Sequence, residues 1–275
     1  MQHYIQVTIR GLLTGQAEIL IALLSEAGFE GFEEGEDELK ACIPQPAWNP
    51  GLLEEVVAPF ACTCTTELLP PRNWNAEWEQ QYQPVIVDGF AGVRAHFHPP
   101  LSGVEYEIII TPQMSFGTGH HATTWQMLWL MRELDLAGKT VFDFGAGTGV
   151  LAILAEKRGT AAVLAMDIDD WCIENALENA ERNHCTRLEV IQGDAPPADR
   201  QFDCILANIN RHILLQHMPR LANALVPGGH LLISGFYADE NNLLVEAAAN
   251  TGLALQRSSQ RDNWSCLQLK KIKPL

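Results

Sequence analysis

Long apolar runs are missing from the 275-residue sequence, and none reaches the roughly 18 residues that a membrane-spanning helix needs. The N-terminus, MQHYIQVTIRG, lacks a basic segment followed by an apolar one, so no secretory signal is expected. There is no internal repeat and no low-complexity tract. With 47% hydrophobic and 19% charged residues, the chain is predicted to be a soluble, globular, cytoplasmic protein with room for two domains.

Paired cysteines are also missing. The seven cysteines contain no CxxC pair, and their odd number fits a reducing compartment in which thiols serve as small core residues. His120 and His121 are adjacent and therefore point to different faces, and no Cys, Asp or Glu spacing converges on them. The sequence therefore predicts no metal site.

Basic residues are scarce: 18 Lys and Arg stand against 34 Asp and Glu, a net charge of −16. Phosphate binding depends on clustered cations, so direct nucleic-acid binding is not expected, and a basic protein is the more natural partner. Residues 1–70 hold eleven Asp and Glu against Arg10 and Lys40, which gives −9 of the total. We interpret the main acidic run either as a solvated hairpin tip or as a surface for that partner; its members are Glu30, Glu33, Glu34, Glu36, Asp37 and Glu38.

The first 69 residues predict a small βαββαβ domain. HYIQVTI alternates as a strand does, and Thr14 can cap a helix that runs through Ala27. FEGFEEG and ELKACIP resemble the two arms of a hairpin. A second helix near Pro50 and the strand CTCTTELL complete the order. We therefore expect a ferredoxin-like α+β domain over residues 1–69.

A linker helix is predicted over residues 70–84. Pro70 and Pro71 mark the boundary, and Trp74, Trp78 and Tyr82 are spaced by four, so they share one helical face. Such a stripe is most often packing. Its functional interpretation is a connecting helix that sets the angle between two domains.

The stretch VFDFGAGTGVLAI, residues 141–153, predicts a strand, a glycine turn and a helix that bind a nucleotide. Its glycines are spaced GxGxG rather than the GxGxxG of dinucleotide-binding folds. Asp143 would repel a pyrophosphate and would suit an ammonium or a sulfonium, and S-adenosylmethionine carries both cations and no phosphate. Asp167 follows about twenty residues on, where a carboxylate accepts from ribose hydroxyls. Asp167 alone does not distinguish this cofactor from NAD.

Residues 85–275 alternate between strand and helix patterns, which predicts a mostly parallel sheet. Seven strands ending in an antiparallel hairpin are typical of the class I methyltransferase architecture, a Rossmann-like α/β fold. The strands of this sheet are expected at residues 140–144, 162–167, 188–192, 204–207, 230–234, 253–256 and 266–269. Shorter strands are expected before it, around residues 85–87, 93–96 and 106–111.

Three further patches complete the predicted site. The loop PQMSFGTGHHATT leads into a helix whose first turn contains Thr124, where free backbone donors suit a carboxylate. Asp194 follows the third strand, where a carboxylate can accept from an adenine amino group. Asn208 ends the fourth strand at the edge where ligands of open α/β folds bind. Thr124 can equally be a helix cap and Asp194 a loop residue, whereas Asn208 otherwise needs a buried partner.

These motifs resemble one family over nearly the whole chain. SFGTGHHATT, VFDFGAGTGVLAI, AMDID and ANI, preceded by WNAEWEQQYQP and a small N-terminal domain, are similar to the bacterial methyltransferases of ribosomal large-subunit protein eleven, the PrmA family. The resemblance implies methylation of lysine side chains and of the N-terminal amine of that protein, with S-adenosylmethionine as the methyl donor. The cofactor contacts that it implies by motif are Thr124, Gly145, Asp167 and Asn208. Class-level geometry adds Asp143, Gly147 and Asp194.

The acceptor side departs from the family pattern. After ANI the family often continues with LA and a small residue, whereas this chain has Asn210, Arg211 and His212. A lysine with a pKa near 10.4 must lose its proton before it can attack, and the sequence shows no compelling general base, so no catalytic residue is assigned. Two alternatives stay open: a methyltransferase for another protein or a small amine, and a non-catalytic assembly factor that binds S-adenosylmethionine.

Overall fold

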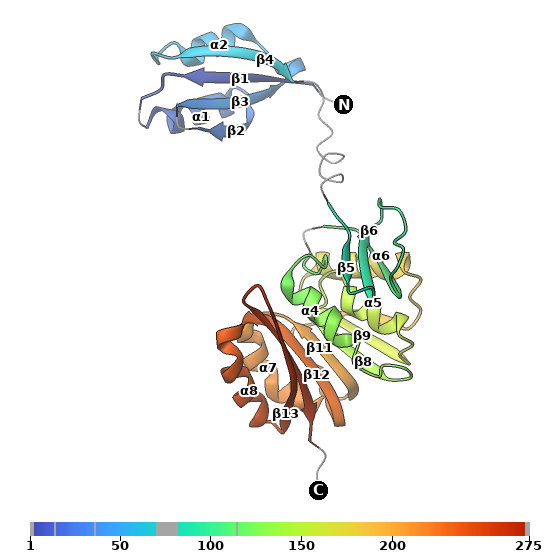
Figure 1. The fold of residues 1–275 in the computed structure, drawn as a ribbon. Helices are drawn as coiled ribbons and strands as arrows, with labels where there is room; N and C mark the ends of the chain where they lie inside the picture. Colours follow the sequence, from blue (N-terminus) through green and yellow to red (C-terminus); the bar gives the residue numbers. More distant parts are fainter. Residues whose placement is uncertain (1–2, 14, 36, 70–81, 114, 273–275) are drawn as a thin grey trace. The chain divides into compact units, whose positions relative to one another are not determined.

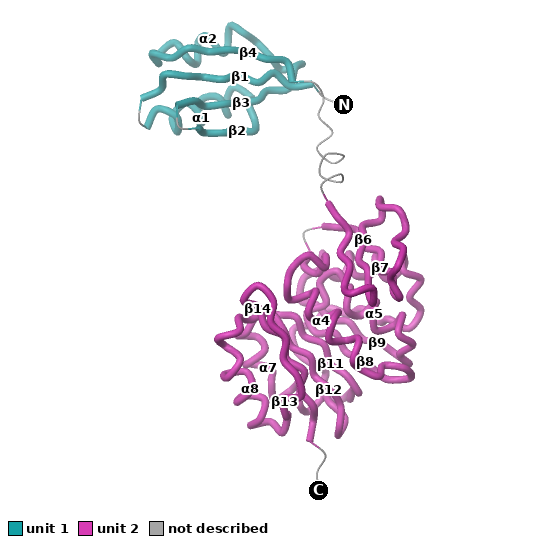
Figure 2. Tube along the Cα trace, in the orientation of Figure 1, with its two compact units in different colours: residues 1–81 teal, residues 82–275 magenta. Residues whose placement is uncertain are grey.

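The computed structural model describes residues 3–13, 15–35, 37–69, 82–113 and 115–272 (Figure 1). The chain divides into two compact units, Met1–Gln81 and Tyr82–Leu275 (Figure 2). The predicted linker helix over residues 70–84, with Trp74 and Trp78, lies almost wholly outside the described residues. The domain limits 1–69 and 85–275 therefore stay a prediction.

The first unit has the predicted βαββαβ order. Its sheet is antiparallel with strand order β2-β3-β1-β4, which is the ferredoxin-like arrangement. Both helices cover one face of this sheet, because Leu20 and Leu24 of the first helix and Leu53 of the second share a core with Val7 and Ile9 of β1. The elements are β1 (Tyr4–Arg10), α1 (Gln16–Glu26), β2 (Glu30–Glu34), β3 (Glu38–Pro44), α2 (Pro50–Val57) and β4 (Thr63–Leu69).

Local residues define where the two small helices begin. Asn49 caps α2 by accepting from the backbone N–H of Gly51 at 3.0 Å, and Pro50 takes the first helical position, where a missing N–H costs little. The N-cap of α1 is Gly15, which makes no side-chain cap hydrogen bond. Thr14, the predicted cap, lies outside the described residues.

The second unit is built on a seven-stranded sheet of order β10-β9-β8-β11-β12-β14-β13, in which only β14 runs antiparallel to its neighbours. This is the predicted class I methyltransferase sheet with its terminal hairpin. Its strands are β8 (Thr140–Phe144), β9 (Ala162–Asp167), β10 (Leu188–Gln192), β11 (Phe202–Asn208), β12 (Leu225–Tyr237), β13 (Leu253–Arg261) and β14 (Trp264–Lys271). Its helices are α4 (Ala122–Met131), α5 (Val150–Lys157), α6 (Asp170–Arg182), α7 (Arg211–Asn223) and α8 (Asn241–Ala249).

Helices lie on both faces of this sheet, as Figure 1 shows. Alternate strand residues point to opposite faces, so Val141 joins the core formed with α4 and α5, whereas Phe142 joins the core formed with α7 and α8. The central strands are therefore mostly apolar, because both of their faces are buried, although Asp143 interrupts β8 and Asp203 interrupts β11.

The structure adds to the sequence expectation in two places. The short strands β5 (Val85–Val87), β6 (Ala91–Ala95) and β7 (Tyr106–Ile110) form a separate three-stranded sheet. β12 is also longer than residues 230–234, because it is hydrogen-bonded to β11 on one side and to β14 on the other. Among the described helices, none is long and apolar enough to cross a membrane.

Candidate cofactor site

A cavity of about 870 Å³ opens at the carboxyl ends of β8, β9 and β11. This is the edge where open α/β sheets bind ligands, and the volume lies within the usual range for small-molecule sites. Five of the seven residues predicted from the sequence line it: Gly145, Gly147, Asp167, Asp194 and Asn208. Their contact with a cofactor stays a prediction.

The turn after β8 needs glycine for two separate reasons. Gly145 and Gly147 have φ values of 77° and 54°, a region that L side chains rarely adopt. A Cβ at Gly145 would also collide with the side chain of Ile209, and one at Gly147 would collide with the carbonyl oxygen of Phe116. The turn is therefore packed against two other segments that form the cavity.

Thr148 fastens the loop before α4 to this turn. Its backbone N–H donates to the carbonyl oxygen of Phe116 at 2.9 Å, and its hydroxyl donates to the carbonyl oxygen of Gly117 at 2.8 Å. Phe116 lines the cavity and is half exposed. The FGTGHHATT motif thus contributes to the cavity wall through its backbone as well as its side chains.

The carboxylate of Asp167 is held by backbone donors. Oδ2 accepts from the N–H of Gly147 at 2.8 Å, and Oδ1 accepts from the N–H groups of Ile168 at 2.8 Å and Asp169 at 3.2 Å. These bonds fix the orientation of the carboxylate and leave further lone pairs for a ligand. The arrangement suits an acceptor for ribose hydroxyls.

Asp143 lies behind the turn and does not line the cavity. Its side chain is fully buried, with Oδ2 accepting from the N–H of Ala152 at 3.1 Å and Oδ1 without a partner. The pKa of this carboxyl is raised to about 7, chiefly by burial; the bond from Ala152 opposes the shift and the nearby negative charge of Asp167 adds to it. The contact of Asp143 with a cofactor therefore stays a prediction.

Thr124 and Asn208 lie together. The Nδ2 of Asn208 donates to the Oγ1 of Thr124 at 3.2 Å, and Thr124 is fully buried. The Oδ1 of Asn208 is buried and has no hydrogen-bond partner among the residues that the structure describes. Thr124 does not line the cavity but orients the residue that does, so an amide oxygen is left for a donor that enters the site.

Several lining residues were not anticipated from the sequence. Ser115 is buried in the cavity wall with an unpartnered Oγ, and His217 is buried there with an unpartnered Nδ1. Trp171 adds a half-exposed ring. Ser115 belongs to the loop that the sequence did single out, whereas His217 lies inside an ordinary amphipathic helix and carries no sequence signal.

The charges of the cavity favour a cation without phosphate. Asp167, Asp169 and Asp194 line it, and Arg220 is the single arginine among the lining residues, which include no lysine. A pyrophosphate would meet this excess of carboxylates, whereas an ammonium or a sulfonium would be attracted. Together with the unpartnered polar atoms, these charges fit S-adenosylmethionine.

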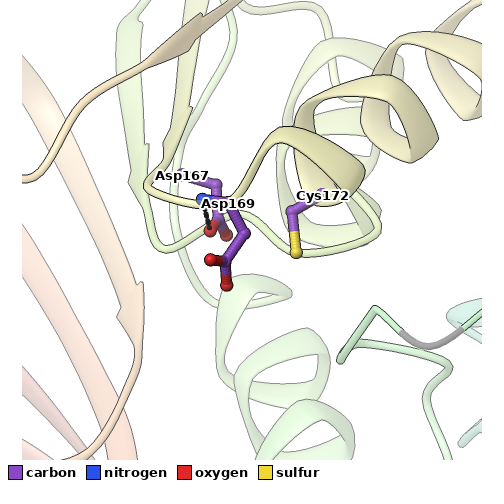
Figure 3. Close-up of side chains that lie close together, drawn as sticks. All are labelled: Asp167, Asp169 and Cys172. Atoms are coloured by element: carbon purple, nitrogen blue, oxygen red, sulfur yellow. Dashed lines mark hydrogen bonds between the residues drawn. The ribbon is translucent and has the colours of Figure 1, made fainter.

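One cluster in this wall has the residue types of a metal site. Possible ligand atoms of Asp167, Asp169 and Cys172 all lie within 4.8 Å of one another (Figure 3). The Asp167 carboxylate already accepts three backbone N–H bonds, one of them drawn in Figure 3, and burial raises the pKa of the Cys172 thiol. Most of the lone pairs of Asp167 are therefore already used by backbone donors, and the cluster carries no metal assignment.

The acceptor-side residues are held together by an ion pair. Asn210 lines the cavity and caps α7 by accepting from the N–H of Ile213 at 3.2 Å. Arg211 pairs with Glu240, whose other carboxylate oxygen accepts from the N–H of Tyr237 at 2.9 Å. The pair therefore joins the segment after β11 to the segment after β12.

Comparisons with known proteins agree with this geometry. Residues 15–272 match the family model described as ribosomal protein L11 methyltransferase (PrmA). The protein of that name from Porphyromonas gingivalis is 44% identical, covering 94% of this chain and 91% of the relative, and that from Bacteroides thetaiotaomicron is 37% identical, covering 91% and 92%. A crystal structure of ribosomal protein L11 methylase from Lactobacillus delbrueckii subsp. bulgaricus matches with a TM-score of 0.65 at 27% identity, covering 70% of this chain and all of the other.

These matches confirm the predicted fold, the predicted family resemblance and S-adenosylmethionine as the cofactor. The match to the family model covers the seven-stranded sheet and the part of the small antiparallel unit that follows β1. The chain belongs to the ribosomal protein L11 methyltransferase family.

Proposed function

We propose that this chain transfers methyl groups from S-adenosylmethionine to lysine side chains and to the N-terminal amine of ribosomal protein L11, in the cytoplasm where ribosomes assemble. The single observation that carries the acceptor chemistry is the unpartnered Oδ1 of Asn208 at the carboxyl end of β11. An amine that enters the cavity can donate to this oxygen, which satisfies a buried acceptor and orients the nitrogen lone pair.

The bound cofactor supplies an already activated methyl group on a sulfonium, so the protein mainly has to align the acceptor. The Oγ1 of Thr124 fixes the amide of Asn208, and Gly145 and Gly147 allow the turn to approach the ligand. Asp167 and Asp194 are proposed to accept from the ribose hydroxyls and the adenine amino group. The carboxyl of Asp143 lies behind the glycine turn, so Asp143 is proposed to influence cofactor binding through the position of that turn.

The attacking amine must be neutral. Free lysine has a pKa near 10.4, so only about one part in a thousand is neutral at neutral pH. Loss of water on entry into the cavity favours the neutral form of the amine, whereas the carboxylates that line the cavity favour its charged form. The described residues around Asn208 present no carboxylate poised against the amine, so we propose deprotonation by solvent before docking and leave the general base unassigned.

The acidic hairpin of the first unit is proposed to bind the basic substrate protein. Glu34 is exposed on β2 and has no cation partner among the described residues, whereas Glu33 and Glu38 pair with Lys40. Unpaired carboxylates leave negative potential for a basic partner, and that attraction weakens as salt rises.

The test is incubation of the whole chain with labelled S-adenosylmethionine and purified ribosomal protein L11, followed by mass spectrometry of the methylated sites. Methyl groups on lysines and on the N-terminal amine support the proposal. Transfer only to another protein or to a small amine would contradict the substrate, and binding of the cofactor without any transfer would point to an assembly factor.

Two variants connect the outcome to Asn208. Asn208→Ala is expected to lower turnover by roughly 100-fold, because the amine loses its orienting acceptor. Asn223→Ala, at the exposed last position of α7, is the matched control and is expected to retain turnover.

A further inference from the structure

His217 is a polar residue of the cavity wall that the proposed function does not use. Four residues of α7 line the cavity at helical spacing: Ile213, Gln216, His217 and Arg220. His217 is the most enclosed of the polar ones, with 7% of its surface exposed. Its ring packs edge-on against Phe144, which also lines the cavity, with centroids 5.4 Å apart and an interplanar angle of 72°. Packing against the ring of Phe144 limits how the imidazole can turn.

The hydrogen-bonding state of this imidazole follows from its surroundings. Nδ1 is buried and finds no hydrogen-bond partner within the described part of the chain. An unpaired buried N–H is less tolerated than a bare acceptor atom, so the proton of the neutral ring belongs on Nε2. Burial lowers the pKa of His217, the charge of Arg220 lowers it further, and Asp194 opposes both, so the ring is neutral at pH 7. It therefore presents one N–H donor, on Nε2.

A donor and an acceptor are thus brought to the same part of the cavity. Asp194 lines the cavity and acts electrostatically on His217. Adenine presents the complementary pair: an exocyclic amino group that donates, next to a ring nitrogen that accepts. A hypoxanthine or guanine base carries an oxygen in place of that amino group, which would face the carboxylate of Asp194.

We propose that His217 selects the adenine base of the cofactor by donating its Nε2–H to a ring nitrogen beside the exocyclic amino group, while Asp194 accepts from that amino group. This deepens the proposed function, because it rests on Asp194 as the adenine acceptor. It concerns binding alone and does not depend on which amine is methylated.

The experiment measures calorimetric affinity of the whole chain for S-adenosylhomocysteine, its 1-deaza and 7-deaza analogues, and S-inosylhomocysteine. The variant is His217→Phe, which keeps an aromatic edge against Phe144, and the control is His96→Phe, an exposed histidine outside the cavity. His217→Phe is expected to bind S-adenosylhomocysteine about 10-fold more weakly than the wild type does. For the one deaza analogue that lacks the contacted nitrogen, the variant and the wild type are expected to have the same affinity. The wild type is expected to disfavour the inosyl compound by 100-fold or more.

Equal losses for S-adenosylhomocysteine and both deaza analogues would overturn the proposal, as would an unchanged affinity in His217→Phe. If His217→Phe fails to fold, the NMR chemical shifts of the imidazole nitrogens in the wild-type chain decide the question. Nε2 must carry the proton, and its chemical shift must change when S-adenosylhomocysteine binds. A proton on Nδ1 instead would contradict the proposal. If the chain discriminates between the bases but transfers no methyl group to ribosomal protein L11, the proposed substrate is contradicted and this inference stands. If the chain methylates ribosomal protein L11 but does not discriminate between the bases, this inference is contradicted and the proposed substrate stands.

Discussion

Glu33 and Glu38 in the unit Met1–Gln81 pair with cations at the surface, whereas Asp143 and Asp167 in the unit Tyr82–Leu275 accept from backbone N–H groups. Glu38 is bonded to Arg10 at 2.7 Å and lies 3.4 Å from Lys40, and the Arg10 guanidinium lowers the pKa of this carboxyl. Asp143 and Asp167 instead bond to the backbone of the glycine turn and of the helix that follows it.

The difference lies in what each carboxylate holds in place. A surface ion pair is screened by water and salt and adds little to the free energy of unfolding. A carboxylate bonded to backbone donors fixes the path of the chain, and removing it leaves buried donors unsatisfied. The effect of the carboxylates in the first unit is therefore expected to follow from their net charge. The effect of those in the second unit is expected to depend on the backbone groups to which each one is bonded. The following predictions test that contrast.

The largest expected effect is the pH dependence of Asp143→Asn. The folded chain holds a proton on Asp143 up to about pH 7, whereas an unfolded chain releases it near pH 4. The folded state therefore binds more protons between these values, so the wild type loses stability as pH rises through this window. Asp143→Asn does not lose stability in this way, and its side chain keeps an acceptor for the N–H of Ala152. The free energy of unfolding of the variant, relative to that of the wild type, is therefore expected to rise by on the order of 4 kcal/mol from pH 4 to pH 8. Urea unfolding across this range measures it.

The exposed Asp199→Asn is the control, and its unfolding curves are expected to follow the wild type at every pH. If the Asp143→Asn and wild-type stabilities ran parallel with pH, the buried carboxyl would titrate normally and the contrast between the units would be lost.

Asp167→Ala is expected to come second. It removes the acceptor for the N–H groups of Gly147, Ile168 and Asp169 together with the proposed ribose acceptor. Affinity for S-adenosylhomocysteine is expected to fall roughly 100-fold or more, about 3 kcal/mol. Calorimetry measures the affinity, with Asp199→Ala as the control. An affinity within threefold of the wild type would show that Asp167 only shapes the turn.

Arg211→Ala is expected to have a smaller effect on the acceptor side. The ion pair with Glu240 is partly exposed, so its loss is expected to cost about 1 kcal/mol of stability. Because Arg211 does not line the cavity, cofactor affinity is expected to stay the same while the KM for the protein substrate rises. Steady-state kinetics with each substrate varied in turn separates the two, and a matching loss of cofactor affinity would contradict this assignment.

The smallest effect on unfolding is expected from neutralising the acidic run. Replacement of Glu33, Glu34, Glu36, Asp37 and Glu38 by Gln is expected to leave the unfolding midpoint nearly unchanged, because the four of these residues that the structure describes, Glu33, Glu34, Asp37 and Glu38, are exposed or half-buried. Binding of the basic substrate is expected to weaken and to lose its salt dependence. Unchanged substrate binding in this variant would remove the proposed role of the hairpin.

The sequence predicted the positions of the glycine turn after β8 and of Asp167 at the end of β9, because spacing within one strand, turn and helix determines their geometry. It did not place Asp143. A polar residue near the end of a strand can face the ligand or the interior, and only the packing of α5 over the turn decides which. It also missed His217, whose significance depends on Phe144 and on an unpaired nitrogen that no sequence pattern records.

The contacts of the glycine turn have a consequence for folding kinetics. Because Gly145 and Gly147 have no Cβ, the side chain of Ile209 and the carbonyl oxygen of Phe116 can pack against them. Both contacts join segments that lie far apart along the chain. Contacts between distant segments require loops to close first, so they form late. We therefore expect the cavity to be among the last parts of the sheet to mature and among the first to exchange its amide protons, although its strands lie at the centre of the fold.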